Sequence, residues 1–242
     1  MADVETLVDE LAKLPPEEAI ASLRRRVALT KGEFARLSAK ERAQSFTVAG
    51  VVDLDIISET LQAITDAIAE GKTYEEFVET IGAKLEAEWG DSVANPGARL
   101  ETIFRTNVQS AYAAGRYEQA TDPDTLAVRP YWMFSAILDG RTTPVCEAAD
   151  GTVRPASDAW WHSHSPPCHF QCRSTVITLS EDLAKEEGIT HGPLSTVPAA
   201  KGFGGPPDIA WKPKATDYPN DAWREFHAKM AAGADARDAR GA

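Results

Sequence analysis

Apolar residues in the first half of the chain recur every three or four positions, which predicts amphipathic helices. Ile57, Leu61, Ile64 and Ile68 mark one buried stripe, and Gly71 is placed to end that helix. Thr73 and Glu76 have the spacing of a capping box, so a second helix is expected to begin there. Its apolar face continues through Tyr74, Phe77, Val78, Ile81 and Leu85.

Two short helices are expected before this pair, over residues 4–12 and 16–26, separated by Pro15 and Pro16. The longest helix is predicted over residues 98–119, after a loop at residues 91–97. Its buried side is expected to carry Leu100, Ile103, Phe104, Val108, Ala111 and Tyr112.

The pattern changes after residue 121. Asp122, Pro123 and Asp124 indicate a turn, and residues 131–138 and 174–179 are rich enough in aromatic and branched residues to form strands. Asp139 and Gly140 indicate a turn after the first strand, and residues 141–173 show little regular patterning. We therefore expect an α+β protein, mainly helical, with N-terminal helices, a long central helix, a small antiparallel sheet, an irregular Cys/His loop and an extended tail.

The expected domain organisation has three parts. Residues 1–43 form an N-terminal helical arm, residues 44–182 the central domain, and residues 183–242 a tail rich in proline and glycine. A short helix is possible at residues 181–188 and another at 222–232, while Gly202, Gly204 and Gly205 are interpreted as linker.

The net charge of −12, from 25 basic and 37 acidic residues among 242, argues against a basic DNA-binding protein. Most of the excess acidic residues lie in the N-terminal part of the chain. Residues 1–100 hold 11 basic and 19 acidic groups, whereas residues 183–242 hold eight of each. No apolar run is long enough for a membrane span, and the start lacks a secretory signal, so folding in the cytoplasm is expected.

Every basic residue between 101 and 182 is an arginine, and we interpret these as structural anchors because the guanidinium fork suits fixed hydrogen bonds. They are Arg105, Arg116, Arg129, Arg141, Arg154 and Arg173. Two adjacent tryptophans in the same region, Trp160 and Trp161, are expected to be one buried and one partly exposed.

All three cysteines lie in the irregular segment, which argues for metal binding or reactive thiols over a disulfide framework. A structural zinc would take four nitrogen or sulfur ligands, and the candidate set is Cys146, His164, Cys168 and Cys172, with His162 and His169 as alternates. The alternative is a scaffold of buried thiols and hydrogen-bonded histidines without a metal. No cofactor is certain.

A cysteine hydrolase is the enzymatic alternative, with Cys168 or Cys172 paired to His164 and oriented by Asp150 or Asp158. The spacing of these residues is not diagnostic of a triad. Common nucleotide, zinc-protease and serine-hydrolase motifs are missing from the sequence. No catalytic residue is assigned, and a non-enzyme is expected.

Several blocks in order resemble one known family. They are residues 46–50, 104–107, 111–116 and 129–132, then Leu138 to Cys146, residues 150–153, Trp160 with Trp161, Pro166 with Pro167, and His169 to Arg173. Together they resemble the phage Mu F-like head morphogenesis family, also called minor head or minor capsid proteins, over residues 44–179. Members often have cysteines where this chain has Thr143 and Ser174, so a full cysteine quartet is missing here.

The resemblance implies structural roles for a set of motif residues, namely Arg105, Asn107, Asp139, Arg141, Asp150, Trp161 and Arg173. We expect Asp139 to cap the turn after the first strand. Arg141 and Arg105 are expected to tie the irregular loop to the long helix.

The resemblance also implies a non-enzymatic role in head morphogenesis, in which such proteins associate with the portal protein, are retained inside the virion head, and influence DNA packaging or delivery. Further partners would be the major capsid protein or the scaffold protein, and no association with a membrane is expected. Docking is expected through helices in residues 1–95 or through the tail. The alternative is a metal-stabilised nucleic-acid-binding module. Weak DNA contact is then expected in the tail, through Lys201, Lys212, Lys214, Arg224 and Lys229.

Overall fold

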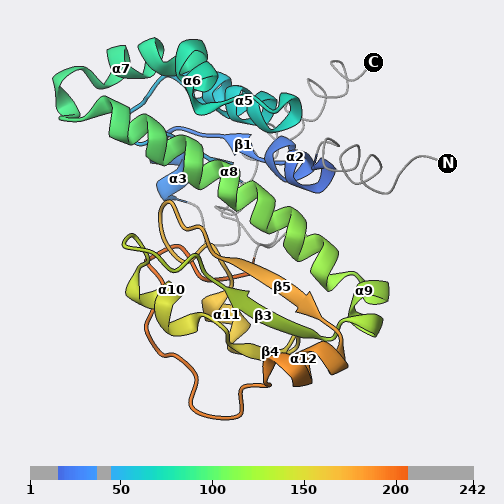
Figure 1. The fold of residues 1–242 in the computed structure, drawn as a ribbon. Coiled ribbons are helices and arrows are strands. Elements are labelled where there is room, and N and C mark those ends of the chain that lie inside the picture. Colours follow the sequence, from blue (N-terminus) through green and yellow to red (C-terminus); the bar gives the residue numbers. More distant parts are fainter. Residues whose placement is uncertain (1–15, 37–44, 207–242) are drawn as a thin grey trace.

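The computed structural model describes residues 16–36 and 45–206, so the helices expected at residues 4–12 and 222–232 lie outside the described residues. A helical lobe and a lobe with a small sheet are joined by the long helix α8 (Pro96–Thr121) (Figure 1). Each lobe has its own hydrophobic core, and α8 contributes Leu100 to the first and Ala120 to the second. The expected α+β architecture, mainly helical with a small antiparallel sheet, is confirmed.

The two helices predicted from the apolar stripe are present in the helical lobe. Helix α5 (Leu54–Glu70) begins at Asp53, whose carboxylate accepts two backbone N–H groups, and ends at Gly71, where φ is 69°. The capping box of Thr73 and Glu76 is confirmed. The next helical run is continuous but loosens at its centre into a π-helical segment; its parts are α6 (Tyr74–Phe77), η1 (Val78–Gly82) and α7 (Ala83–Trp89), followed by the short 3₁₀ turn η2 (Gly90–Ser92).

Helix α2 (Glu17–Arg24) packs directly on α8, and its buried Ala19, Ile20 and Leu23 join the helical core. The close approach explains the glycine inside the long helix, because a Cβ on Gly115 would lie 2.9 Å from the backbone nitrogen of Ala19. The described part of the expected N-terminal arm therefore packs with the central domain.

A short parallel strand pair beside α2 was not expected from the sequence. Strand β1 (Val27–Ala28) pairs with β2 (Ser45–Phe46), and helix α3 (Lys31–Ala35) follows β1. Strands of two residues are too short to show an alternating pattern, so sequence reasoning had no signal for them.

The predicted long helix is confirmed as α8, and its predicted buried side is correct at all but one residue. Leu100 and Ala111 are buried and Ile103, Phe104 and Val108 are partly buried, but Tyr112 is 45% exposed. The expected turn at residues 122–124 opens a further helix, α9 (Pro123–Val128), because the Asp122 side chain caps it and Pro123 fits its first position.

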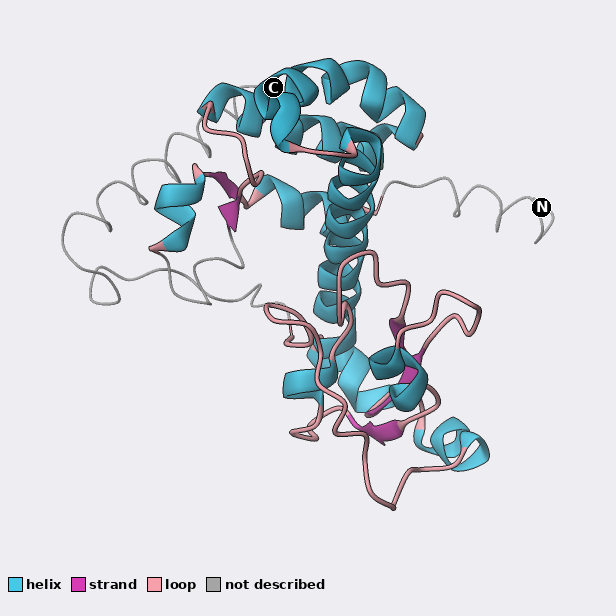
Figure 2. Ribbon diagram, turned by 90° about the vertical axis from the view of Figure 1, so that its left-hand side faces the viewer, coloured by secondary structure: helices cyan, strands magenta, loops and turns pink. Residues whose placement is uncertain are grey.

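The sheet has the order β4-β3-β5 and is antiparallel throughout, with β3 (Tyr131–Ser135) between β4 (Val153–Pro155) and β5 (Thr175–Leu179) (Figure 1). In Figure 2 the strands of this lobe are magenta and long pink loops surround them. Strand β3 ends at Ser135, three residues earlier than expected. The segment thought to be irregular contains β4 and two short helices, α10 (Pro144–Ala149) and α11 (Trp161–His164). The predicted helix after the sheet is confirmed as α12 (Glu181–Glu187).

Residues 189–206 lie along the sheet lobe and are fastened to it by hydrogen bonds. The indole of Trp160 donates to Ser195 O at 3.1 Å, and the backbone nitrogen of Ala200 donates to Cys168 O at 2.9 Å. Gly204 is buried, and a Cβ there would lie 2.5 Å from the carbonyl oxygen of Ser163. Interpreting Gly204 as linker is therefore wrong: this position is packed and requires glycine.

Candidate metal centre

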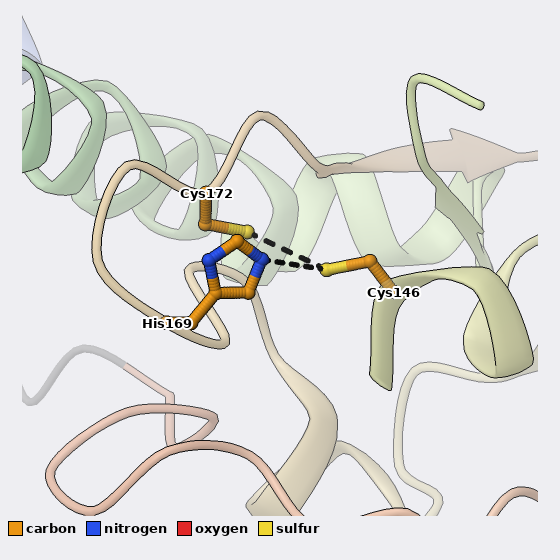
Figure 3. Close-up of side chains that lie close together, drawn as sticks. All are labelled: Cys146, His169 and Cys172. Atoms are coloured by element: carbon orange, nitrogen blue, oxygen red, sulfur yellow. Dashed lines mark hydrogen bonds between the residues drawn. The ribbon is translucent and has the colours of Figure 1, made fainter. Parts of the chain in front are cut away.

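Three side chains from two chain segments meet in the sheet lobe. Cys146 lies on α10, and His169 and Cys172 lie on the turn before β5 (Figure 3). The Cys146 Sγ is 3.3 Å from His169 Nε2 and 3.7 Å from Cys172 Sγ. The structure thus gathers two of the predicted ligands, Cys146 and Cys172, with the alternate His169.

Local backbone chemistry places these groups. Pro144 occupies the first turn of α10, where its missing N–H and fixed φ are tolerated, and Cys146 follows on the buried face of that helix. Gln171 adopts a left-handed φ of 56°, and the backbone nitrogen of Cys172 donates to His169 O at 3.3 Å. The tight turn therefore directs His169 and Cys172 toward one centre.

The turn is tied to the long helix by Gln171. Its backbone nitrogen donates to Thr106 Oγ1 at 3.2 Å, and its side-chain amide donates to Thr102 Oγ1 at 2.7 Å. Gln109 adds a bond from its amide to Ser174 O at 3.0 Å. Polar side chains on one face of α8 therefore fix the position of the Cys/His turn.

The tautomer of His169 follows from its second ring nitrogen. Nδ1 lies 2.7 Å from the carbonyl oxygen of Phe170, which can only accept a hydrogen bond, so Nδ1 carries the proton. In the neutral ring Nε2 then keeps its lone pair, and that atom faces the Cys146 sulfur.

All three thiols are buried, with exposed fractions of 3%, 0% and 2% for Cys146, Cys168 and Cys172. A hydrogen bond with Cys168 and burial raise the pKa of Cys146, and a hydrogen bond with Cys146 together with burial raises the pKa of Cys172 well above its usual range. The hydrogen bond between Cys146 and Cys172 acts in the opposite direction on the pKa of Cys146. An activated nucleophile needs a lowered thiol pKa, so this environment is that of structural cysteines.

Two other histidines of the predicted set lie elsewhere. His164 stacks on Trp160 with ring centroids 4.4 Å apart, its Nδ1 bonds to Ser163 Oγ at 2.9 Å and its Nε2 to Val197 O at 3.3 Å. His162 is exposed. Cys168 is buried in the same core as Cys146 but stands outside the closest group of three.

The arginine anchors are only partly as expected. Asp139 does cap its turn, accepting from the Arg141 nitrogen at 2.8 Å, but the Arg141 side chain is 82% exposed. Arg105 bonds to Glu101 on its own helix at 2.6 Å. The predicted tie through Arg141 and Arg105 is therefore wrong, since Gln171 and Gln109 make that connection. The fixed carboxylate pairs belong to Arg173, with Asp139, and Arg154, with Asp158.

Two further motif residues have structural partners. Asp150 accepts a hydrogen bond from the backbone nitrogen of Ala136 at 2.7 Å, which joins the end of β3 to the end of α10. Asn107 accepts from the Arg26 guanidinium at 3.0 Å, and burial lowers the pKa of Arg26 to about 10. Both groups bridge segments far apart in the sequence.

Trp160 and Trp161 are both buried, so the expected partial exposure of one of them is wrong. Trp160 is 8% and Trp161 2% exposed, and their rings pack edge to face with centroids 4.9 Å apart. Trp132 of β3 packs on Trp161 in the same manner. The three rings form the centre of the second core.

The sequence relatives of this chain are phage and prophage proteins. The chain is 33% identical over 192 residues to the putative capsid assembly protein F of Escherichia phage Mu, and 31% identical over 157 residues to the Mu-like prophage FluMu F protein of Haemophilus influenzae. The family described as phage Mu protein F like protein matches residues 58–177. The chain belongs to this Mu F-like family.

The matched regions cover 74% and 61% of this chain but only 43% and 37% of those two relatives, so the chain spans about two fifths of their length. No solved structure matches it significantly. Among the helices of residues 16–36 and 45–206, none combines the length and the apolar character needed to cross a membrane.

Proposed function

We propose that this protein acts in phage head morphogenesis as a minor head protein, which associates with the portal and is retained inside the head. The observation that carries the proposal is the extent of the family match. Residues 58–177 run from α5 through β5 and include α8 and the Cys/His turn, so both lobes belong to the shared unit. The phage Mu relative carries capsid assembly in its name.

The role proposed is non-enzymatic. Burial of the three thiols and the raised pKa of Cys146 and Cys172 favour a scaffold over a nucleophile. Influence on DNA packaging or delivery is part of the same proposal. Contact with DNA through the tail stays a prediction, because Lys201 is exposed but the other four tail cations lie outside the described residues.

One exposed apolar pair supports a docking role for the sheet lobe. Ile137 and Leu138 follow β3 in the chain and are 53% and 59% exposed. The neighbouring Asp139 is held by Arg173, so the pair sits on a braced loop. Exposed apolar side chains on a rigid support are typical of protein interfaces. We propose a portal contact at this pair, in addition to the expected segments at residues 1–95 and in the tail.

The test is co-purification of the full chain with the portal protein of the same phage. Retention of the portal in a stoichiometric complex is expected, and I137S/L138S is expected to weaken it by at least about tenfold, which corresponds to about 1.4 kcal/mol. The control is V128S, because Val128 is also an exposed apolar residue, at 65%, but lies on α9. Absence of a complex with the wild-type chain would reject the portal association.

A further inference from the structure

The spacing of the Cys/His group fits a tetrahedral zinc ion. With Zn–S bonds of about 2.3 Å, two thiolates of a tetrahedral site lie about 3.8 Å apart, and a thiolate and an imidazole nitrogen about 3.5 Å apart. The observed separations are 3.7 Å between the Cys146 and Cys172 sulfurs and 3.3 Å between Cys146 Sγ and His169 Nε2. A zinc ion therefore needs only small side-chain adjustments to enter.

His169 is oriented as a metal ligand. Histidines that bind metals almost always donate their other ring N–H to a carboxylate, a carbonyl or water, which fixes the tautomer. The Nδ1–H bond to Phe170 O provides this second interaction, and it leaves the Nε2 lone pair directed at the Cys146 sulfur. A hydrogen-bonded thiol pair alone does not require this arrangement.

We propose that Cys146, His169 and Cys172 hold a structural Zn²⁺ ion, with Cys168 as the fourth ligand. Cys168 is fully buried in the same core and directly precedes His169 in the chain. Binding releases three thiol protons to solvent, because the sulfur ligands coordinate as thiolates. His169 is only partly buried, which leaves a path for the ion from the surface. The site does not depend on the proposed role in head assembly.

The ion would close the loop between β3 and β5. Cys146 is on α10, whereas the other three ligands are on the turn that Gln171 fastens to α8. Zinc would thus join α10 to the long helix through that turn. In a lobe whose strands have only three to five residues, such a crosslink adds stability that the sheet itself cannot supply.

The first experiment measures zinc in the full-length chain purified without chelator. One zinc per chain is expected by elemental analysis, and replacement by Co²⁺ should give the intense visible bands of a tetrahedral site with thiolate charge transfer. A chain that takes up no zinc from a buffered zinc solution would overturn the proposal, whether its three thiols stay free or Cys146 and Cys172 form a disulfide.

Variants then test the ligand set by competition with a chelator. Loss of an outer-shell partner alone costs about 10–100-fold in metal affinity. We therefore expect H169A and C146S each to lower zinc affinity by more than about 100-fold. H162A is the matched control, since His162 is an exposed histidine of the same segment, and it should bind zinc like the wild type. Unchanged affinity in H169A would reject the site, and unchanged affinity in C168A would reject Cys168 as the fourth ligand. Because the wild-type measurement comes first, a variant that fails to fold leaves the proposal testable.

Discussion

Arg173 donates two parallel hydrogen bonds to the carboxylate of Asp139, 2.7 Å from Nη1 to Oδ2 and 2.6 Å from Nη2 to Oδ1. The pair joins the turn after β3 to the residue that follows Cys172. Because a bidentate arginine fixes both position and direction, it sets the loop that carries Ile137 and Leu138 against the segment that carries the cysteines.

The pair makes the stability of the protein sensitive to acid. The hydrogen bonds from Arg173 hold the pKa of Asp139 well below its ordinary value of 3.8. A carboxylate with a lowered folded-state pKa contributes its full stability above the unfolded-state pKa and loses it as the pH falls. We expect D139N, which keeps an acceptor for the turn, to melt below the wild type between pH 5 and pH 7, with the difference shrinking below about pH 4.

Thermal melts of D139N, R173Q and the double variant across this pH range measure the effect. In the R173Q background the D139N substitution should change the melting temperature little, because the partner is already gone. A difference between wild type and D139N that grows as the pH falls contradicts this account of the pair.

Gly115 allows α2 and α8 to touch. Alanine would raise helix propensity by about 1 kcal/mol. Its Cβ, however, would sit 2.9 Å from the nitrogen of Ala19, and backbone cannot yield as a flexible side chain does. We expect G115A to lower the free energy of unfolding by about 1–3 kcal/mol in chemical denaturation. G97A is the control near the start of the same helix, where the nearest atom is 3.8 Å away, and it should be neutral or stabilising.

Gly204 fastens the chain after α12 to the sheet lobe. Its φ is 83°, its nitrogen donates to Pro167 O at 3.0 Å, and a Cβ would meet the Ser163 carbonyl oxygen at 2.5 Å. We expect G204A to lower stability by at least about 1 kcal/mol and to speed proteolysis around residues 195–205. Its neighbour Gly205 has only one atom in reach, at 3.8 Å, so G205A is the control. Equal protease sensitivity of the two variants would argue that the segment is not packed.

Trp161 is the largest fully buried side chain of the sheet lobe, and its indole donates to Pro155 O at 3.1 Å. Truncation to alanine should cost about 3–5 kcal/mol of unfolding free energy, since it leaves a cavity and an unpaired carbonyl. L138A, at a 59% exposed position, should stay within about 0.5 kcal/mol of the wild type. A small loss for W161A would show that this core repacks easily.

Elements with a local signature were predictable from the sequence. The stripe from Ile57 to Ile68, the glycine stop at Gly71 and the capping box at Thr73 specify their helices without tertiary help. Strand β4 has three residues and ends in a proline, so it forms only because it pairs with β3. No local sequence pattern predicts that pairing. The same holds for Gly204, whose role appears only where two distant segments meet.

The candidate site was predictable as a region but not as a set of ligands. The clustering of Cys146, Cys168 and Cys172 identified the segment, yet His164 and His169 are equivalent by spacing alone. Their tertiary contacts differ. His164 stacks on Trp160 and bonds to Val197 O, away from the cysteines, whereas the left-handed backbone of Gln171 places His169 beside Cys146. The partners of the arginines were not predictable for a similar reason. Whether an arginine reaches Glu101 or Asp139 depends on its rotamer and on the local backbone direction, which the sequence does not show.

The central claim, a role in building the phage head, is tested most directly by quantitative mass spectrometry of purified heads from the phage that encodes this chain. The chain is expected in DNA-filled heads in a fixed, low ratio to the portal, and deletion of its gene should reduce the yield of filled heads. Heads that lack the chain, formed and filled normally after the deletion, would contradict the account.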